Sequence, residues 1–219
     1  MSTNTKIALS FTALLLVAAL ALIAFLAAQQ PPSATPPEPG AAPPSALQAD
    51  TRILDEGSSG VTVVEFLDFE CEACGAFYPY VEELRATYAG EVTFAFRYFP
   101  LPGHGNSVNA AVAVEAAARQ DALEPMFSRM FETQASWGER GNESQAHVFR
   151  GYAQELGLDM AQFDADVASP EVLARVQSDF DGGIALGVSS TPTFFVNDHK
   201  MTLNSPDDLM IAIEAELEK

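Results

Sequence analysis

The chain opens with a long apolar stretch that differs from everything after it. Residues 7–28 hold no charged side chain, and only Ser10 and Thr12 interrupt their apolar character. A helix of this length covers roughly 33 Å, which is enough to cross the hydrocarbon core of a bilayer. The stretch exceeds the apolar core of an ordinary secretory signal and lacks a good cleavage site. We therefore predict an uncleaved transmembrane anchor, with a cleaved signal peptide as the alternative.

The residues around this stretch predict how the chain is oriented. Residues 1–6 carry Lys6 and the amino terminus, whereas no Lys or Arg follows until Arg52. The positive-inside bias places residues 1–6 in the cytosol and everything after the anchor outside it. Residues 29–50 hold seven of the 14 prolines, a composition that favours an extended spacer. The expected location is thus the cell membrane, with one crossing and an extracytoplasmic folded part.

The folded part begins near residue 51 with a pattern typical of a β-α-β unit. Residues 61–69 form a nearly continuous apolar, β-branched run, which predicts a strand buried on both faces. Apolar positions then recur at three-to-four spacing from about Cys71, which predicts a helix that ends near Gly90. Residues 92–98 alternate apolar and polar positions with the period of a second strand.

The rest of the chain predicts a helical region, a hairpin and a last helix. Apolar stripes at helical spacing occupy residues 107–185, and residues 193–197 have the pattern of a strand. Asn197-Asp198 predicts a tight turn into another short strand, and the residues after 205 carry one more helical stripe. The order β, α, β, helices, β, β, α indicates an α/β fold.

Composition and charge restrict the classes of function. The chain has 11 basic and 30 acidic side chains, a formal net charge of −19 at pH 7. This balance excludes a nucleic-acid binder, because a phosphate backbone requires a basic surface. Two cysteines are too few for a disulfide-stapled scaffold, and the three histidines show no metal-ligand spacing. We therefore expect neither a metal site nor a bound cofactor.

The two cysteines, Cys71 and Cys74, stand where the first strand ends and the first helix begins. The free N–H groups and the dipole of a helix N-terminus favour a thiolate at the first position. The spacing allows a disulfide within one helical turn, with the first sulfur exposed and the second shielded, which predicts thiol–disulfide exchange. The alternatives are a copper or zinc site and an inert structural disulfide, although so short a loop adds little stability.

A second motif places Pro192 directly before the strand at residues 193–197. A proline at such a position is tolerated when its peptide bond is cis and the turn is tight. A cis bond opposite the cysteines would leave the backbone of Thr191 free to pair with a bound peptide. An ordinary proline at the start of a strand is the alternative.

Together these motifs resemble the DsbA-like thiol–disulfide oxidoreductases, and in particular the membrane-anchored extracytoplasmic members of Gram-positive bacteria. The motifs are Phe66-x-Asp68-x-x-Cys71-x-x-Cys74, Phe99-Pro100-Leu101-Pro102-x-His104, and Gly187-Val188-x-x-Thr191-Pro192-Thr193-Phe194. The similarity covers about residues 52–218. It implies a DsbA-like domain at residues 51–219, namely a thioredoxin fold with an all-helical domain inserted at about residues 103–187.

The resemblance also implies roles for individual residues. Cys71 would be the reactive sulfur and Cys74 its buried partner, while Thr191 and the cis proline Pro192 would bind the substrate. The family places a buried acid at the position of Glu65 as a proton relay to the second cysteine. A carboxylate in an apolar strand would have a raised pKa. The alternative is a glutamate that reaches solvent or pairs with an arginine.

The residues around the cysteines depart from the family pattern. Many relatives carry proline after the first cysteine, and the strongest oxidant carries histidine before the second, where this chain has Glu72 and Ala73. Neither side chain offers the Cys71 thiolate a positive charge, and Glu70 and Glu72 flank it with negative charge. We therefore predict a weaker oxidant than the strongest member of the family. Asp68 is expected to orient the loop before Cys71.

The expected activity is disulfide exchange with extracytoplasmic proteins, in the oxidase direction because the compartment is oxidising. By the resemblance, reoxidation implies a membrane partner of the DsbB or vitamin-K-epoxide-reductase type. Two alternatives stay open at this point. One is a disulfide reductase or isomerase, and the other is a non-catalytic metal-binding or chaperone module with the same fold.

Overall fold

A computed structural model describes residues 45–138, 141 and 143–219, and the structural statements below concern this part of the chain. The predicted anchor at residues 7–28 lies outside the described residues, and so does most of the predicted spacer at residues 29–50. Within the described ranges, no helix is both long enough and apolar enough to cross a membrane.

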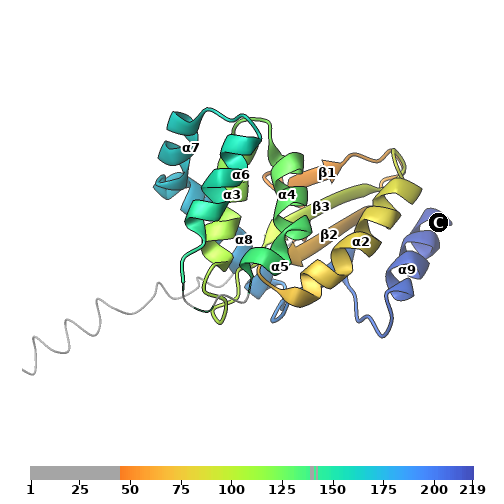
Figure 1. Cartoon of the computed structure of the whole chain (residues 1–219). Coiled ribbons are helices and arrows are strands. Elements are labelled where there is room, and N and C mark those ends of the chain that lie inside the picture. Colours follow the sequence, from red (N-terminus) through yellow and green to blue (C-terminus); the bar gives the residue numbers. More distant parts are fainter. Residues whose placement is uncertain (1–44, 139–140, 142) are drawn as a thin grey trace, which may run out of the picture. The chain divides into compact units, whose positions relative to one another are not determined.

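A five-stranded mixed sheet forms the centre of the domain (Figure 1). Its members are β1 (Arg52–Asp55), β2 (Thr62–Leu67), β3 (Thr93–Tyr98), β4 (Thr193–Val196) and β5 (His199–Lys200). They follow the order β1-β3-β2-β4-β5. The pair β2–β3 is parallel, as a β-α-β unit requires, and the other neighbours are antiparallel. The predicted α/β class is confirmed.

Strand β1 is an addition that the hydropathy pattern does not predict. It is only four residues long, it is partly buried throughout, and its register with β3 shifts between Ile53 and Asp55. Its two ends are held by ion pairs, because Arg52 bonds Glu115 and Asp55 bonds Arg85 at 2.5 Å. A strand stabilised by charges at its ends leaves no alternating apolar signature in the sequence.

Two groups of helices accompany the sheet. Helices α2 (Glu72–Thr87) and α9 (Asp207–Leu217) share one buried cluster with strands β2, β3 and β4. The helices between β3 and β4 are α3 (Ser107–Ala118), α4 (Leu123–Glu132), α5 (Gln134–Trp137), α6 (Ala146–Glu155), α7 (Met160–Val167) and α8 (Pro170–Ala185). We call α3 to α8 the helical insert. Most of it gathers at one end of the sheet, away from α9 (Figure 1).

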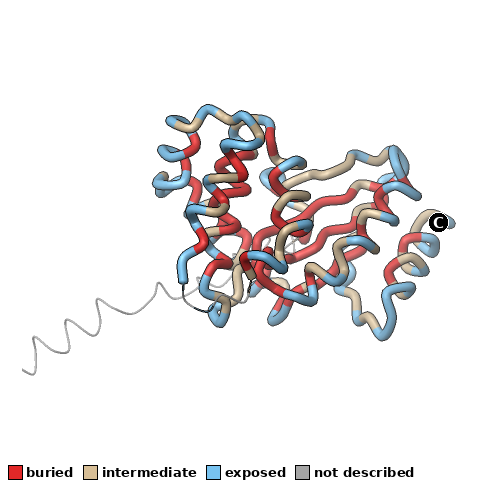
Figure 2. Tube along the Cα trace, viewed as in Figure 1, coloured by how far each residue is buried: buried red, intermediate tan, exposed pale blue. Residues whose placement is uncertain are grey.

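Alternation along the central strands decides which side chains lie under which helices. Val63 packs with Val81 and Leu84 of α2, whereas Phe66 belongs to a different cluster that includes Phe180 of α8. The sheet is therefore buried on both faces, and its central strands are buried along almost their whole length (Figure 2). Glu65 shares the pleat of Val63 and so lies on the face that α2 covers.

Candidate active site

The two cysteines stand at the junction of β2 and α2. Cys71 is the N-cap of α2, and Cys74 lies in the first turn of that helix. Both are free thiols, and their exposed fractions are only 6% and 1%. The expectation that the first sulfur is exposed is therefore wrong, because the start of β4 covers Cys71, whereas the second sulfur is shielded as expected. The Cys71 N–H donates to the carbonyl of Asp68 at 3.1 Å, which turns the chain sharply into the helix. The structure thus brings the C-x-x-C together in its reduced form.

The two thiols have opposite electrostatic environments. A hydrogen bond from the Cys74 thiol lowers the pKa of Cys71 to about 5, against the effect of burial and with help from Thr191 and the N–H groups of Cys74 and Ala73. Burial, followed by the hydrogen bond to Cys71, raises the pKa of Cys74 well above its usual value. At neutral pH the reduced pair is therefore a thiolate at Cys71 beside a protonated Cys74.

Thr191 and Pro192 lie against Cys71, although 120 residues of chain separate them from it. Pairing of β4 with β2 brings the start of β4 next to the site, and the Thr191–Pro192 peptide bond is cis. The Cys71 sulfur is 3.5 Å from the Thr191 carbonyl oxygen. The Thr191 hydroxyl is buried and has no hydrogen-bond partner among the described residues, and its position beside Cys71 lowers the pKa of that thiol.

Glu65 is a buried acid behind the cysteines. Burial raises its pKa to about 8, with further contributions from the charges of Cys71 and Glu82. It lies near enough to Cys74 for its own charge to raise the pKa of that thiol. No ion pair forms at Glu65 among the described residues, and its side chain is 7% exposed. The structure therefore places it neither in solvent nor beside an arginine.

The flanking residues that the sequence analysis singled out differ in their positions. Glu72 and Ala73 are exposed, and Ala73 acts on Cys71 only through its backbone N–H. Glu70 is buried, and its Oε2 accepts the N–H of Asn106 at 2.6 Å. The two glutamates that flank Cys71 in the sequence thus differ in their surroundings, because Glu70 is bonded to the loop before α3 and Glu72 is at the surface.

Asp68 orients the loop before Cys71, as the sequence suggested, but through more partners than it indicated. Its carboxylate accepts the Ser107 hydroxyl at 2.7 Å, and the N–H groups of Leu101 and Glu70 at 3.0 and 2.9 Å. The Nδ1 atom of His104 lies 2.6 Å from Oδ2 of the same carboxylate. The side chain thus connects three segments: the cysteine loop, the β3–α3 loop and the start of α3.

Gln134 of α5 is a site residue that the sequence analysis missed. Its Nε2 donates to the carbonyls of Phe69 and Cys71, each at 2.8 Å. A Cβ added at Gly75 would lie 2.0 Å from Oε1 of Gln134, so the glycine leaves room for this contact. No sequence signal marks a lone glutamine 63 residues from the cysteine that it contacts.

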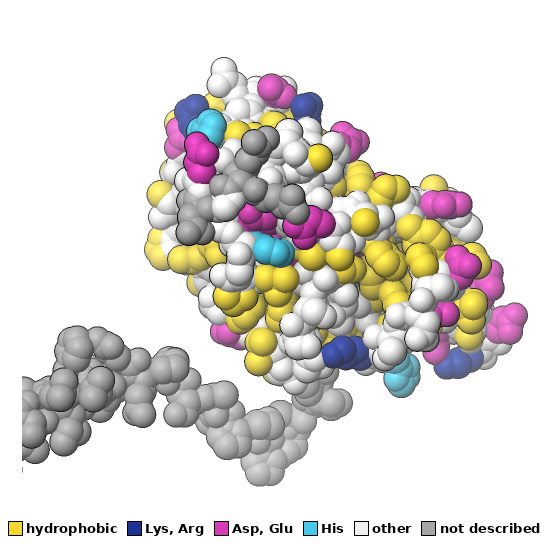
Figure 3. All heavy atoms as spheres, turned by 60° about the horizontal axis from the view of Figure 1, so that its bottom comes forward, with side chains coloured by type: hydrophobic (Ala, Val, Ile, Leu, Met, Phe, Trp, Pro, Cys, Tyr) yellow, Lys and Arg dark blue, Asp and Glu magenta, His cyan; other side chains and the backbone are white. Residues whose placement is uncertain are grey.

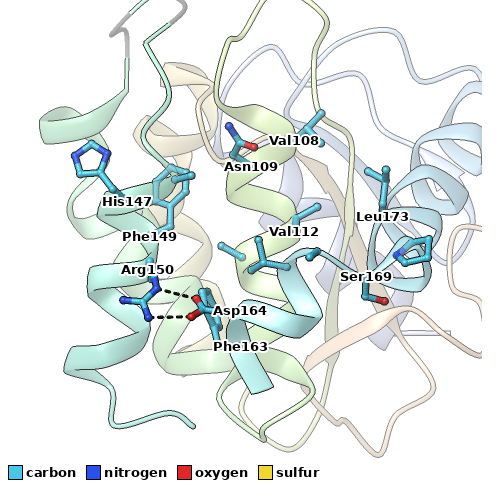
Figure 4. A pocket seen from close by; sticks show the side chains of 15 residues that line it. Val108, Asn109, Val112, His147, Phe149, Arg150, Phe163, Asp164, Ser169 and Leu173 are labelled. Carbon is cyan, nitrogen blue, oxygen red and sulfur yellow. Dashed lines mark hydrogen bonds and ion pairs between the residues drawn. The ribbon is translucent and has the colours of Figure 1, made fainter. Parts of the chain in front are cut away.

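Among the described residues, two hollows in the surface are large enough to be considered for ligand binding. A small one next to Cys71 is lined by Glu70, Glu72, Gln134, Ala135 and Gly138. A larger one lies in the helical insert between α3, α6, α7 and α8 (Figure 4). Apolar side chains dominate its lining, and the Arg150–Asp164 ion pair borders it. No residue of the cysteine site lines the larger hollow.

The comparisons with known families and solved structures agree with one another. A family model described as thioredoxin matches residues 50–215. BdbD from Bacillus subtilis has a TM-score of 0.67 at 22% identity, covering 78% of this chain and 94% of that one. A thioredoxin-like oxidoreductase from Silicibacter pomeroyi gives 0.66 at 26% identity, covering 78% and 95%. Wolbachia pipientis alpha-DsbA1 gives 0.67 at 19%, covering 78% and 92%.

Curated relatives match with higher identity but over a smaller share of their length. A Na(+)/H(+) antiporter NhaA from Herminiimonas arsenicoxydans is 37% identical over 141 residues, which are 64% of this chain and 21% of that protein. NhaA 3 from Salinispora tropica is 38% identical over 138 residues, or 63% and 20%. The chain spans about a fifth of the length of these relatives, and antiport is an activity of those longer proteins.

Proposed function

The chain belongs to the thioredoxin family, with the fold of its DsbA-like thiol–disulfide oxidoreductases, and from this premise we propose that it oxidises protein thiols through Cys71 and Cys74. The observation that carries the proposal is the contrast between the two sulfurs. Cys71 is a nucleophile and leaving group with a pKa of about 5, and Cys74 is a more deeply buried thiol with a raised pKa.

The reaction begins with the Cys71–Cys74 disulfide. A substrate thiolate attacks the Cys71 sulfur, the bond to Cys74 breaks, and a mixed disulfide joins the substrate to Cys71. A second substrate thiolate then attacks the substrate sulfur of this bond and releases Cys71 as a thiolate. Two electrons pass from the substrate to the protein. Because a thiol of low pKa leaves readily, the environment of Cys71 favours the second step.

Glu65 is the candidate proton donor for the first step. The sulfur of Cys74 leaves as a thiolate in surroundings that strongly favour its protonated form. With its pKa near 8, Glu65 is protonated at neutral pH and can supply that proton. In the reverse reaction the same carboxylate takes the proton back and makes Cys74 nucleophilic. A buried acid with a pKa near the working pH can both donate and accept a proton, which this transfer requires.

The proposed substrates are extended or unfolded proteins. The side of the domain on which α2 and α5 begin carries a broad area of hydrophobic side chains with acidic ones at its borders (Figure 3). Such a surface suits apolar segments that a folded protein would hide. The backbone of Thr191, within 3.5 Å of the Cys71 sulfur, is placed to align such a segment next to the reacting atom.

We further propose that the domain works outside the cytosol, tethered by residues 7–28 and reoxidised by a membrane partner of the DsbB or vitamin-K-epoxide-reductase type. The support is the charge-free apolar stretch, the lysine before it and the proline-rich residues after it. An oxidising compartment is needed for net disulfide formation, because cytosolic reductants would keep both thiols reduced. Protease protection of a tagged C-terminus in spheroplasts tests the orientation.

Trapping of the mixed disulfide tests the proposed activity. Cys74→Ala removes the resolving thiol, so clients should accumulate on Cys71 as complexes that a reductant releases. Cys71→Ser is the matched control and should trap nothing. The oxidised wild type should also oxidise reduced ribonuclease A, with both variants inactive. Absence of trapped clients from Cys74→Ala, together with stoichiometric copper or zinc that Cys71→Ser loses, would favour the metal-binding alternative.

A further inference from the structure

A histidine from another loop stands next to the cysteine site. The C-x-x-C itself contains only Glu72 and Ala73 between its cysteines, so it has no cationic side chain of its own. The loop between β3 and α3 instead brings Nδ1 of His104 to 2.6 Å from the Asp68 carboxylate. The main-chain carbonyl of Asp68 accepts the N–H of Cys71 at 3.1 Å. One residue thus holds the imidazole ring on its side chain and the reactive cysteine on its backbone.

The position of the imidazole ring is fixed by the burial and the bonding of its partner. The Asp68 side chain is completely buried, whereas that of His104 is 24% exposed. Every contact of the carboxylate is to a donor: the Ser107 hydroxyl, the Leu101 and Glu70 N–H groups, and the ring. Asp68 therefore cannot turn away without breaking the loop, and the ring keeps one orientation with an edge open to solvent.

The charges around His104 favour its imidazolium form. Partial burial works against the charged ring, but the hydrogen bond and charge of Asp68 outweigh it, and Cys71 and Glu70 add to them, so that the pKa of His104 is raised. All three groups belong to one short segment, from Asp68 to Cys71. Because the interaction of two charges is reciprocal, an imidazolium that the Cys71 thiolate favours also favours that thiolate.

We propose that His104 is a positioning residue of the redox site, whose imidazolium, held by Asp68, stabilises the Cys71 thiolate and makes the protein a stronger disulfide donor. The last part of this statement rests on the proposed oxidase function, whereas the effect on the thiolate does not. Stabilising the reduced thiolate makes the disulfide more oxidising.

The test is the substitution His104→Gln, which retains an N–H donor toward Asp68 but carries no charge. Thiolate absorbance at 240 nm, followed against pH in the reduced protein, should show the pKa of Cys71 raised by about half to one unit. The equilibrium constant with glutathione should move about three- to tenfold toward the protein disulfide, which corresponds to about 15–30 mV. His147→Gln, an exposed histidine of α6, is the matched control and should change neither quantity.

A second measurement needs no variant. In an NMR titration of the wild type, the pKa of His104 should be higher in the reduced protein, where the thiolate is present, than in the oxidised one. A Cys71 pKa unchanged by His104→Gln in a variant that keeps the wild-type thermal midpoint, or equal His104 pKa values in both redox states, would overturn the proposal. If Cys74→Ala traps no client while His104→Gln still shifts the thiolate, the oxidase function fails and this inference stands.

Discussion

Each face of the central sheet buries a carboxylate, but the two carboxylates have different partners. On the face that packs against α8, the guanidinium of Arg97 is fully buried and bonds Asp179 at 2.6 Å, while Arg175 bonds the other oxygen of Asp179 at 2.8 Å. On the face that packs against α2, the buried carboxylate of Glu65 has no cation beside it among the described residues. Burial raises the pKa of both acids, but the two guanidinium groups oppose that rise at Asp179, whereas no cation opposes it at Glu65, whose pKa reaches about 8.

The contrast is sharp because the two sites are neighbours in the sheet. Glu65 is paired in register with Phe96, and the next pair along the same strands is Phe66 with Arg97. The pleat sends successive side chains to opposite faces. Glu65, the buried acid behind the cysteines, and Arg97, the buried partner of Asp179, are therefore on neighbouring rows of the sheet but on opposite faces. We conclude that the buried ion pair joins α8 to one face of the sheet, whereas Glu65 on the other face is a buried acid behind the cysteines.

The largest expected difference between the faces concerns the pH dependence of stability. The folded-state pKa of Glu65 is about 8 and its ordinary value is 4.5, so the stabilisation is complete below about pH 4.5 and is lost as pH rises toward 8. Urea unfolding of the reduced wild type should lose up to about 1.4 kcal/mol per pH unit relative to Glu65→Gln over this window, about 4–5 kcal/mol in all. Parallel pH profiles of the two proteins would mean that Glu65 is not buried unpaired.

The second expected effect comes from breaking the pair on the other face. Asp179→Asn leaves the buried guanidinium of Arg97 without its counter-charge, and we expect a loss of about 3–5 kcal/mol in the free energy of unfolding. The pKa of Cys71 should not change, because the substitution lies on the opposite face. Asp181→Asn, an exposed position on the same helix, is the control for calorimetry and should be nearly neutral. A destabilisation by Asp179→Asn no larger than that of its control would contradict the assigned pairing.

A smaller effect is expected next to Cys71, on the same face as Glu65. Thr191→Val removes a hydroxyl that lowers the pKa of Cys71 while keeping the shape of the side chain. A hydrogen bond contributes about 1 kcal/mol, so the ratio of thiolate to thiol should fall about fivefold near the midpoint, as measured by absorbance at 240 nm. The hydroxyl of Thr193 bonds the Ser190 carbonyl instead, and Thr193→Val should leave the thiol pKa as it is. Equal shifts in both variants would argue against a direct contact.

The smallest effect should come from an ion pair outside both faces. Arg150 and Asp164 bond at 2.7 Å between α6 and α7, and both side chains are exposed. Solvent and salt screen such a pair, so Arg150→Gln should leave the thermal midpoint within experimental error at physiological ionic strength. A shift comparable to that of Asp179→Asn would show that burial does not separate the two kinds of pair.

Much of the fold was predictable because its elements carry local patterns. The β2 strand, the helix after Cys71 and the alternation of β3 all follow from nearest-neighbour periodicity, and the turn at Asn197-Asp198 uses two residues with positive φ, as the dipeptide indicates. β1 was not predictable, because its ends are fixed by Glu115 and Arg85, which are distant in sequence.

The site was predictable only where its residues belong to a short sequence motif. Cys71, Cys74 and Pro192 occur in such motifs, but the Asp68–His104 contact spans 36 residues and the Gln134 contact with Cys71 spans 63. These contacts depend on how the β3–α3 loop and α5 fold back over α2. The direction of the Glu70 side chain depends on the same folding, since its partner Asn106 also comes from the β3–α3 loop.

The sheet has edges that are poor templates for further strands. β5 is two residues long with exposed His199 and Lys200, and β1 is four residues long with a register shift and charged ends. Exposed edges of regular strands recruit unfolded chains and start aggregation, and short, irregular, charged edges do not. A protein that binds unfolded clients at its cysteines would therefore not pair with those clients along the edges of its sheet. Each client could then dissociate once its disulfide is made.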